Sequence, residues 1–342
     1  PDKFVTLSNG YLKTSTKENN GQRTDHWVMD KRHSPYLFFM GVGDYAVVKD
    51  KWRNIPVDYF VEKEYEPYAK QIFGNTPEMM EFFSKKLKYD FPWNKYAQIT
   101  GQDYVSGAME NTTCTLHGSS AQQKPGQLID ENKWESTIAH ELFHHWFGDL
   151  ITAESWSNLT VNESFANYSE YLWNEYKYGK DQADYHLMKD VGMYIHNPRD
   201  FKKDLVRFDY ASREDVFDLV TYQKGGGILH MLRNYLGDDA FWGMEIDGVS
   251  KQQSKHGVNP SLSAAKNSDV RFHLIALGTD IHNFSLNGYK WFDPGTNILV
   301  DQAAIGPLEK HVFTVKAKSS TQYVDNNYSN KLMGMTGQFI VK

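Results

Sequence analysis

The sequence predicts a multidomain chain in which an α+β domain is followed by an all-β domain. Three zones that differ in residue composition and in hydrophobic periodicity lead to this prediction. Residues 1–50 have strand composition with glycine breaks, residues 51–242 carry apolar residues mainly at helical spacing, and residues 243–342 show strand alternation with turn residues between. The length of 342 residues also favours about two domains. We therefore expect domain boundaries after residues 50 and 242.

The predicted elements follow from periodicity and from turn residues. Apolar residues recur at helical spacing between residues 51 and 242, and Gly237 is expected to end the last of these helices. The alternating segments VRFHLIAL, HVFTVKA and GQFIVK read as strands near the C-terminus. The predicted helical segments are residues 63–87, 131–151, 162–179 and 222–237.

Composition excludes several classes of protein. The net charge is −6 with no Lys/Arg block, so we expect no nucleic-acid partner. Cys114 is the only cysteine, which excludes an intrachain disulfide and any site that needs two thiolates. The longest apolar stretch, residues 35–48, is too short for a membrane span and contains Asp44. Because the chain starts at Pro1 with no leader pattern, we expect a processed or trimmed fragment.

The segment HELFH, residues 140–144, is the first candidate for chemistry. On a helix, His140 and His144 stand on one face and can share a zinc ion, while Glu141 can act on a metal-bound water. The alternative is two histidines on an ordinary helix face. His145 points about 100° away from His144 around a helix. We therefore expect it either to contact the metal-ligating residues without binding the metal, or to pack.

A catalytic zinc needs a third protein ligand and an open position. Glu163 lies in the first turn of the next predicted helix, and 18 residues separate it from His144. That length allows the first helix to end and an antiparallel neighbour to return, which would complete a set of two histidines and one glutamate. The alternative is an acidic residue favoured by the helix dipole.

The segment GAMEN, residues 107–111, precedes HELFH by about thirty residues. Gly107 and Ala108 are small enough for a substrate backbone to approach a strand edge. Glu110 can hold a positive charge, and a carboxylate placed there would bind a free α-amine. An ordinary turn glutamate is the alternative reading.

GAMEN, HELFH, NESFANY and LVTYQKGG, in this order, resemble the aminopeptidase-N family of zinc peptidases, a gluzincin group, over about residues 35–242. The resemblance implies a truncated thermolysin-like α+β catalytic domain over residues 51–242, preceded by remnant strands of an N-terminal β domain over residues 1–50. It also implies a role for each site residue: His140, His144 and Glu163 as ligands of one Zn²⁺, Glu141 as general base, Glu110 as amine anchor, Tyr222 as the phenol that stabilises the tetrahedral intermediate, and Gly107, Ala108, Met109 and Asn111 as substrate-binding residues.

The function implied by this resemblance is a zinc metallo-aminopeptidase. It would hydrolyse N-terminal residues from peptides with a free N-terminus by a zinc-activated water, with Glu141 as the general base. The chain departs from the family in two respects: most of the N-terminal β domain, with a further amine-binding residue, is absent, and the helices that follow Tyr222 are missing or replaced. We therefore expect weakened activity or a chain that has lost its natural surroundings.

Residues 246–342 resemble the last cupredoxin domain of multicopper oxidases, on the segments DVRFHLIALGTDIHNFSLNGYKWFD and LMGMTGQFIVK. Copper there needs several histidines and a cysteine thiolate. His282 remains, whereas other residues stand at the expected ligand positions. We therefore expect a cupredoxin-like β-sandwich with no copper. The positions without a suitable ligand are Ser285, Asn287, Tyr289, Val324, Asp325, Asn326 and Asn330.

Two other functions remain open. A thermolysin-type endopeptidase would share the metal set but would not need Glu110. A catalytically weak or inactive zinc-containing binding or scaffold protein would bind zinc without turnover. The sequence does not fix the oligomeric state or whether the two parts form a natural fusion, a chimera or a composite. Both resemblances favour a bacterial periplasmic or extracellular location.

Overall fold

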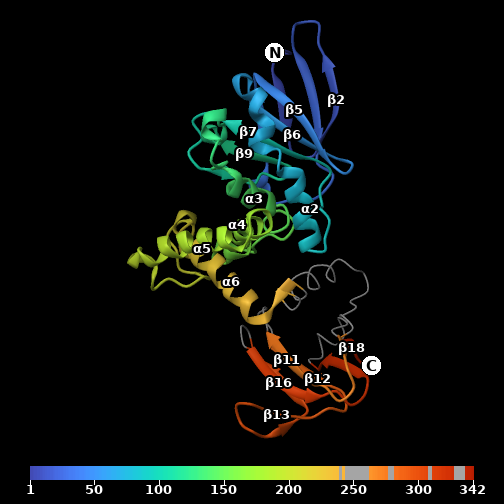
Figure 1. Cartoon of the computed structure of the whole chain (residues 1–342). Coiled ribbons are helices and arrows are strands. Elements are labelled where there is room, and N and C mark those ends of the chain that lie inside the picture. Colours follow the sequence, from blue (N-terminus) through green and yellow to red (C-terminus); the bar gives the residue numbers. More distant parts are fainter. Residues whose placement is uncertain (239–240, 243–261, 276–280, 307–309, 327–335) are drawn as a thin grey trace. The chain divides into compact units, whose positions relative to one another are not determined.

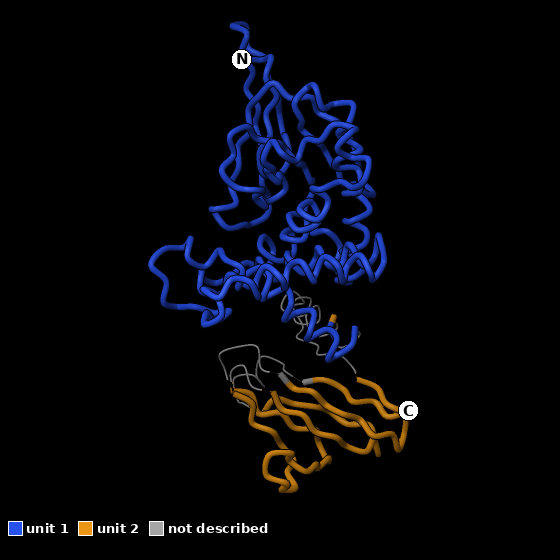
Figure 2. The backbone as a smooth tube through the Cα atoms, turned by 60° about the vertical axis from the view of Figure 1, so that its left-hand side comes forward, with its two compact units in different colours: residues 1–241 blue, residues 242–342 orange. Residues whose placement is uncertain are grey.

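The structure is a computed structural model, and it describes residues 1–238, 241–242, 262–275, 281–306, 310–326 and 336–342. The chain divides into two compact units, Pro1–Phe241 and Trp242–Lys342 (Figure 2). The boundary predicted after residue 242 falls next to this division. The first unit combines sheets and helices, and the second unit is rich in strands.

A five-stranded sheet forms the β part of the first unit, in the order β5-β6-β7-β9-β8. Strands β6, β7 and β9 run parallel, and β5 and β8 run antiparallel to their neighbours. Strand β1 pairs with β4, and β2 pairs with β3. The strand bounds are β1 Val5–Ser8, β2 Tyr11–Lys17, β3 Arg23–Val28, β4 Met40–Gly43, β5 Tyr45–Trp52, β6 Ile55–Glu62, β7 Tyr96–Gly101, β8 Ala108–Met109 and β9 Cys114–Gly118.

The boundary predicted after residue 50 cuts through β5. Strand β5 pairs with β6 along its whole length, from Tyr45 opposite Glu62 to Trp52 opposite Ile55. Since β6 lies next to β7, residues 45–52 are part of the five-stranded sheet. Strand composition identified this segment as β structure, but alternation alone does not tell which sheet a strand joins.

The helices of the first unit follow the predicted segments with shifted ends. The segment 63–87 is divided, because Gly74 ends α1 and Pro77 opens α2, a position at which proline loses no helical hydrogen bond. Gly237 ends α6 with a φ of +79°, as predicted. Helix α5 was not among the predicted segments. The helix bounds are η1 Pro35–Leu37, η2 Lys63–Tyr68, α1 Ala69–Phe73, α2 Thr76–Lys86, η3 Ser119–Ala121, η4 Pro125–Gln127, α3 Glu135–Phe143, η5 Trp156–Asn158, α4 Thr160–Tyr178, α5 Lys180–Ile195, η6 Pro198–Asp200, η7 Arg213–Val216, η8 Val220–Lys224 and α6 Gly225–Leu236.

Helix α3 is shorter than the predicted segment 131–151. It ends at Phe143, and the chain then turns so that the amide of Asp149 donates to the carbonyl of His144 at 2.9 Å. Gly148 has a φ of +140°, which a side chain rarely tolerates, and this residue prevents the helix from continuing. The early end places His144 at the helix terminus.

Helix α4 is the central helix of the first unit. It packs against α3, α5, α6 and η8, and Figure 1 shows α3 between the sheet and the group formed by α4, α5 and α6. Its buried face includes Ala166, Leu172 and Trp173. Because α4 touches both α3 and η8, it brings three candidate segments of the sequence to one place.

The second unit contains a five-stranded sheet in the order β10-β18-β17-β12-β15 and the pairs β11-β16 and β13-β14. Its core is aromatic: Trp291 stacks on Phe313 at 4.0 Å between ring centroids, with Phe272 and Phe339 beside them. The strand bounds are β10 Leu262–Ala264, β11 Asp269–Ile275, β12 His282–Leu286, β13 Trp291–Phe292, β14 Leu299–Val300, β15 Gln302–Ile305, β16 Lys310–Lys316, β17 Thr321–Asp325 and β18 Thr336–Val341.

The strands predicted near the C-terminus are β11, β16 and β18. The cupredoxin-like identity of this unit stays a prediction. His282, the one histidine at an expected copper-ligand position, pairs with Asp325 at 2.7 Å. Asn330, another of the expected ligand positions, lies outside the described residues. Among the helices that the structure describes, none has both the length and the hydrophobicity that a membrane crossing requires.

Candidate metal centre and active site

The two histidines of HELFH lie at the end of α3 with their Nε2 atoms toward one centre. His140 donates Nδ1–H to Glu170 Oε1 at 2.9 Å, and His144 donates Nδ1–H to the carbonyl of Phe147 at 2.9 Å. Both side chains are buried. Because each Nδ1 is engaged on the other side of the ring, Nε2 is the nitrogen that faces the centre, as in metal-ligating histidines.

Glu163 completes this centre from the first turn of α4. Its Oε2 lies 3.3 Å from the Nε2 of His140 and 3.3 Å from the Nε2 of His144. Ligand atoms that surround an ion tetrahedrally at about 2.1 Å stand roughly 3.4 Å from one another. The donor types and their separations therefore fit a zinc ion.

The electrostatics of this centre also favour a cation. Burial lowers the pKa of His144, yet the carboxylates of Glu110 and Glu163 raise that pKa to about 9. Burial likewise raises the pKa of Glu163, but the two imidazoles bring that pKa well below its usual range. Buried carboxylates of this kind need a compensating positive charge, which a divalent ion held between the donors would supply.

Glu141 lies beside this centre without taking part in the three-residue set. Its side chain is buried, and its Oε2 has no hydrogen-bond partner. Burial raises the pKa of Glu141 to about 8, against the opposing effect of His140 and His144. A carboxylate whose pKa is close to neutrality is suited to taking up and releasing a proton.

Glu110 is brought to the same place by the edge of the sheet. It follows β8, the outermost strand, and its carboxylate lies within 4.8 Å of the donor atoms of Glu141 and His144. Burial raises its pKa, as does the charge of Glu163, whereas the imidazole of His144 opposes the rise. A buried carboxylate therefore lies next to the candidate metal ligands His140, His144 and Glu163.

Two of the other residues of GAMEN form the edge strand of the sheet, and Gly107 and Asn111 lie next to it. Ala108 and Met109 form β8 itself, and the carbonyl of Gly107 accepts the amide of Gly118 at 2.8 Å. A Cβ at Gly107 would meet no atom within 4 Å, so space is open there. Asn111 is buried and donates to the carbonyls of Leu37 and Phe38 at 3.4 Å.

Tyr222 reaches the centre from a π-helical turn, η8. Its ring stacks on that of His140, with centroids 5.9 Å apart and planes 10° apart. Burial raises its pKa well above the ordinary value, and the charges of Glu163 and Glu110 raise it further. A hydrogen bond to Glu163 raises the pKa as well, so the hydroxyl is protonated and acts as a hydrogen-bond donor. π-helical turns inside helices are frequent at functional sites.

His145 and Cys114 lie outside the centre. His145 is fully buried, its Nε2 accepts the amide of Thr113 at 2.9 Å, and its ring stacks on Phe91. Burial lowers its pKa to about 3, and the residue packs as expected. Burial raises the pKa of the Cys114 thiol to about 12, which makes it an inert thiol.

Glu170 was missed by the sequence reasoning. Its Oε1 contacts Nδ1 of His140, the ring nitrogen that faces away from the centre. Its other oxygen lies 3.3 Å from the Nε2 of His186 in α5. Residues seven apart share one face of a helix, so the spacing of Glu163 and Glu170 was the available signal. His186 gave no such signal, because its helix was not predicted.

Comparisons with known sequences identify a family model and several relatives. A sequence model described as the peptidase family M1 domain matches residues 72–259. The chain is 31% identical to aminopeptidase N of Canis lupus familiaris over 262 residues, which are 70% of this chain and 26% of that protein. It is 28% identical to endoplasmic reticulum aminopeptidase 1 of Homo sapiens, over 76% of this chain and 28% of that protein.

The solved structures show the same fold. An M1 zinc metallopeptidase from Deinococcus radiodurans, bound to a Tyr-Ser-Ala substrate, aligns with a TM-score of 0.58 and 22% identity, over 73% of this chain and 54% of that one. The present chain therefore spans about a quarter of the length of these curated relatives and about half of the solved one.

Proposed function

The chain belongs to peptidase family M1, and we propose that it is a zinc-dependent aminopeptidase that removes N-terminal residues from peptides. In this proposal His140, His144 and Glu163 hold one zinc ion. When bound, the ion supplies a Lewis acid that activates water and polarises the scissile carbonyl. The observation that carries the proposal is that a buried anion for an amine, Glu110, lies against the same centre.

Glu141 is proposed as the general base. Its unpartnered Oε2 is free to accept a proton from the attacking water, and a pKa of about 8 lets the same group return that proton to the leaving amine. Tyr222 is proposed to donate its hydroxyl hydrogen to the oxygen of the carbonyl as negative charge develops there. Such a fixed donor stabilises the transition state more than the substrate.

Glu110 is proposed to set the register. A protonated α-amine bound to this buried carboxylate forms a charge-assisted hydrogen bond, and the substrate then extends past the metal cluster from its first residue. Gly107, Ala108, Met109 and Asn111 are proposed to align the peptide along the edge of β8. An endopeptidase of the thermolysin type has no need of a buried anion at this position, so the geometry favours the aminopeptidase.

The test compares a free and a blocked N-terminus. The zinc-loaded chain is assayed with alanine p-nitroanilide and with its N-acetyl derivative, and we expect turnover of the free amine alone. Glu110→Gln is expected to lower kcat/KM for the free amine by about 10- to 100-fold, the value of a charged hydrogen bond. Glu154→Gln, an exposed glutamate of the same type, serves as the matched control. Equal cleavage of both substrates would overturn the proposal.

A further inference from the structure

The segment that precedes Tyr222 is organised by the carboxylate of Asp218. Asp218 Oδ1 accepts the backbone amides of Val220 at 3.1 Å and Thr221 at 3.2 Å. The amide of Tyr222 in turn donates to the carbonyl of Asp218 at 3.1 Å. The carboxylate therefore caps the first turn of η8, where backbone amides lack partners within the helix.

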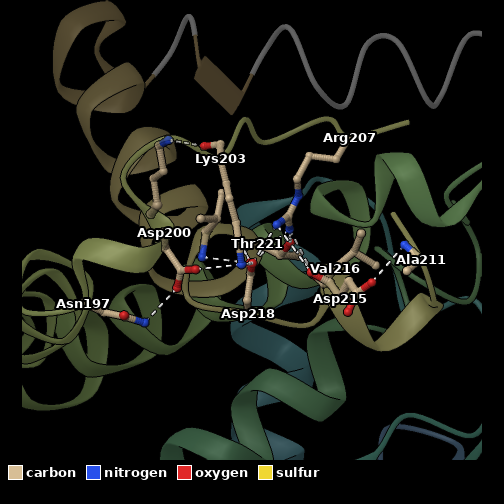
Figure 3. A network of polar contacts seen from close by, with 11 residues as sticks. Asn197, Asp200, Lys203, Arg207, Ala211, Asp215, Val216, Asp218 and Thr221 are labelled. Atoms are coloured by element: carbon tan, nitrogen blue, oxygen red, sulfur yellow. Dashed lines mark hydrogen bonds and ion pairs between the residues drawn. The ribbon is translucent and has the colours of Figure 1, made fainter. Parts of the chain in front are cut away.

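Asp218 is itself held by two cations, as Figure 3 shows. Arg207 donates NH1–H to Oδ2 at 2.6 Å and NH2–H to Oδ1 at 3.0 Å, while Lys203 lies 2.8 Å from Oδ2. The Arg207 and Asp218 side chains are largely buried, with 12% and 14% of their surfaces exposed. A two-pronged pair of this kind fixes orientation as well as distance.

The same guanidinium also contacts η8 directly. Arg207 NH2 donates to the hydroxyl of Thr221 at 3.0 Å, and that hydroxyl donates to the carbonyl of Val216 at 2.6 Å. The ion pair therefore binds the turn through a backbone cap on one side and a side-chain hydroxyl on the other.

η8 is also bound to α4, the helix that carries Glu163. Ser164 Oγ donates to the carbonyl of Thr221 at 2.6 Å. At Gly225, the residue directly after η8, a Cβ would lie 1.9 Å from the same Ser164 oxygen, and η8 itself packs against α4. A shift of η8 thus changes where Tyr222 stands relative to Glu163.

We propose that the ion pair of Asp218 and Arg207 is a positioning device for the Tyr222 hydroxyl. The pair does not touch the substrate; it holds η8 in the π-helical form that directs the phenol to the reacting carbonyl. This inference rests on the proposed function, because it assigns the pair a role in that reaction. A pair that merely stabilised residues 197–221 would affect folding and leave catalysis by the folded enzyme unchanged.

The first test is a double-mutant cycle in the zinc-loaded full chain. Asp218→Asn removes the charge and keeps the shape, and we expect kcat to fall by about 10- to 100-fold, as a small misplacement of a catalytic group does, with KM changed by less than about threefold. In the Tyr222→Phe background the same substitution is expected to cost less than about twofold, because the hydroxyl it positions is gone.

Asp215→Asn is the matched control for this cycle. Asp215 lies three residues earlier and is exposed, and its carboxylate accepts the amides of Ala211 and Ser212. We expect no change in kcat. An equal loss of kcat for Asp218→Asn in both backgrounds, or a loss confined to KM, would overturn the inference.

The second test does not depend on activity. Hydrogen–deuterium exchange is followed in the peptide that covers residues 219–224, with zinc content and the thermal midpoint as folding controls. Asp218→Asn is expected to speed exchange of the Val220 and Thr221 amides by at least tenfold. Arg207→Lys keeps the charge but cannot form two parallel hydrogen bonds with the carboxylate, so it is expected to speed exchange as well. It also replaces Asp218→Asn as the test variant if Asp218→Asn fails to fold.

These readouts separate two failures. Absence of hydrolysis by the unaltered chain would contradict the proposed function, while faster exchange in the variants would still support the part of the inference that concerns η8. Unchanged exchange in both Asp218→Asn and Arg207→Lys would overturn the inference even if the unaltered chain is an active aminopeptidase.

Discussion

Glu141 shows how a single buried side chain acquires a chemical role. Its Oε2 has no hydrogen-bond partner, and burial brings its pKa to about 8. A buried polar atom without a partner is costly, and such atoms are retained where function requires them. The cost is consistent with a group that must accept a proton during the reaction.

Glu141→Gln is expected to lower kcat by about 10²- to 10⁴-fold, the usual contribution of a general base. Zinc should remain bound, because Glu141 is not part of the His140, His144 and Glu163 set. Metal content by mass spectrometry and hydrolysis of an aminoacyl reporter are measured on one sample. Glu131→Gln, at an exposed site before α3, is the control. Full activity in Glu141→Gln would exclude the assigned base.

His117 gives a test of stability that is independent of catalysis. Its Nε2–H donates to Gln98 at 2.9 Å, and its Nδ1 accepts the indole N–H of Trp134 at 3.1 Å. Burial lowers its pKa to about 3. The unfolded chain takes up a proton near pH 6.5 and the folded chain does not, so the stability that the neutral ring contributes is full above pH 6.5 and is lost as the pH falls toward 3.

We therefore expect the difference in unfolding free energy between the unaltered chain and His117→Gln to shrink by about 2 kcal/mol from pH 7 to pH 5. Urea unfolding at a series of pH values measures it. A constant difference for His117→Gln would show that the folded ring takes up its proton as readily as the unfolded one.

At the residue scale, the sequence was informative where chemistry fixes the residue type. His140, His144 and Glu163 could be paired from spacing and metal preference, and the structure brings them together. Tyr222 could not be chosen among 21 tyrosines without the family resemblance. The residues around it do not mark it as a site residue, because the place of the π-helical turn depends on the contact of Thr221 with Ser164, which is distant in sequence.

The junction of α4 and α6 explains two of the three successive glycines at residues 225–227, Gly225 and Gly226. A Cβ at Gly226 would lie 2.2 Å from Asn167 Oδ1, whereas at Gly227 the nearest atom is Val191 Cγ2 at 3.8 Å. Two helices can approach this closely only where one of them lacks side chains. The run of three glycines does not by itself indicate which of them the packing needs.

Gly226→Ala and Gly227→Ala form a matched pair at this junction. Gly226→Ala is expected to lower the unfolding free energy by about 1–3 kcal/mol through overpacking. Gly227→Ala is expected to raise it by about 0.5–1 kcal/mol, because alanine favours the helix. Urea unfolding of both variants decides the matter, and equal effects of the two substitutions would contradict the packing described for α4 and α6.

Element bounds were less predictable than element types. The segment 131–151 was expected to be one helix, and α3 covers only Glu135–Phe143 because Gly148 turns the chain. Strand β5 was assigned to the first zone, although pairing with β6 places it in the central sheet. The first error arises from the local backbone turn at Gly148, and the second from strand pairing, which alternation alone does not specify.

At the scale of the whole molecule, the two units have separate cores. The second unit is built around Phe272, Trp291, Phe313 and Phe339, and the groups of residues able to hold a metal, among those the structure describes, lie in the first unit. The residue pattern of the sequence changes near residue 242, next to this division.

Metal removal is expected to affect the two units differently. A ligand that binds only the folded state stabilises by about 2.7 kcal/mol at a concentration of 100 times its Kd, so calorimetry of the zinc-loaded chain should show one transition lowered by roughly 5 °C or more on chelation and a second transition unchanged. Glu163→Gln should show no shift on chelation. If both transitions move together, the metal does not belong to one unit alone.

The central claim is that His140, His144 and Glu163 share a single ion, and anomalous diffraction at the zinc edge from crystals of the zinc-loaded chain tests it most directly. We predict one peak, about 2.0–2.2 Å from the Nε2 atoms of both histidines and from a carboxylate oxygen of Glu163. A peak held instead by Glu110, Glu141 and His144, the other cluster of donors at this place, would contradict the account, as would a peak that Glu163 does not touch.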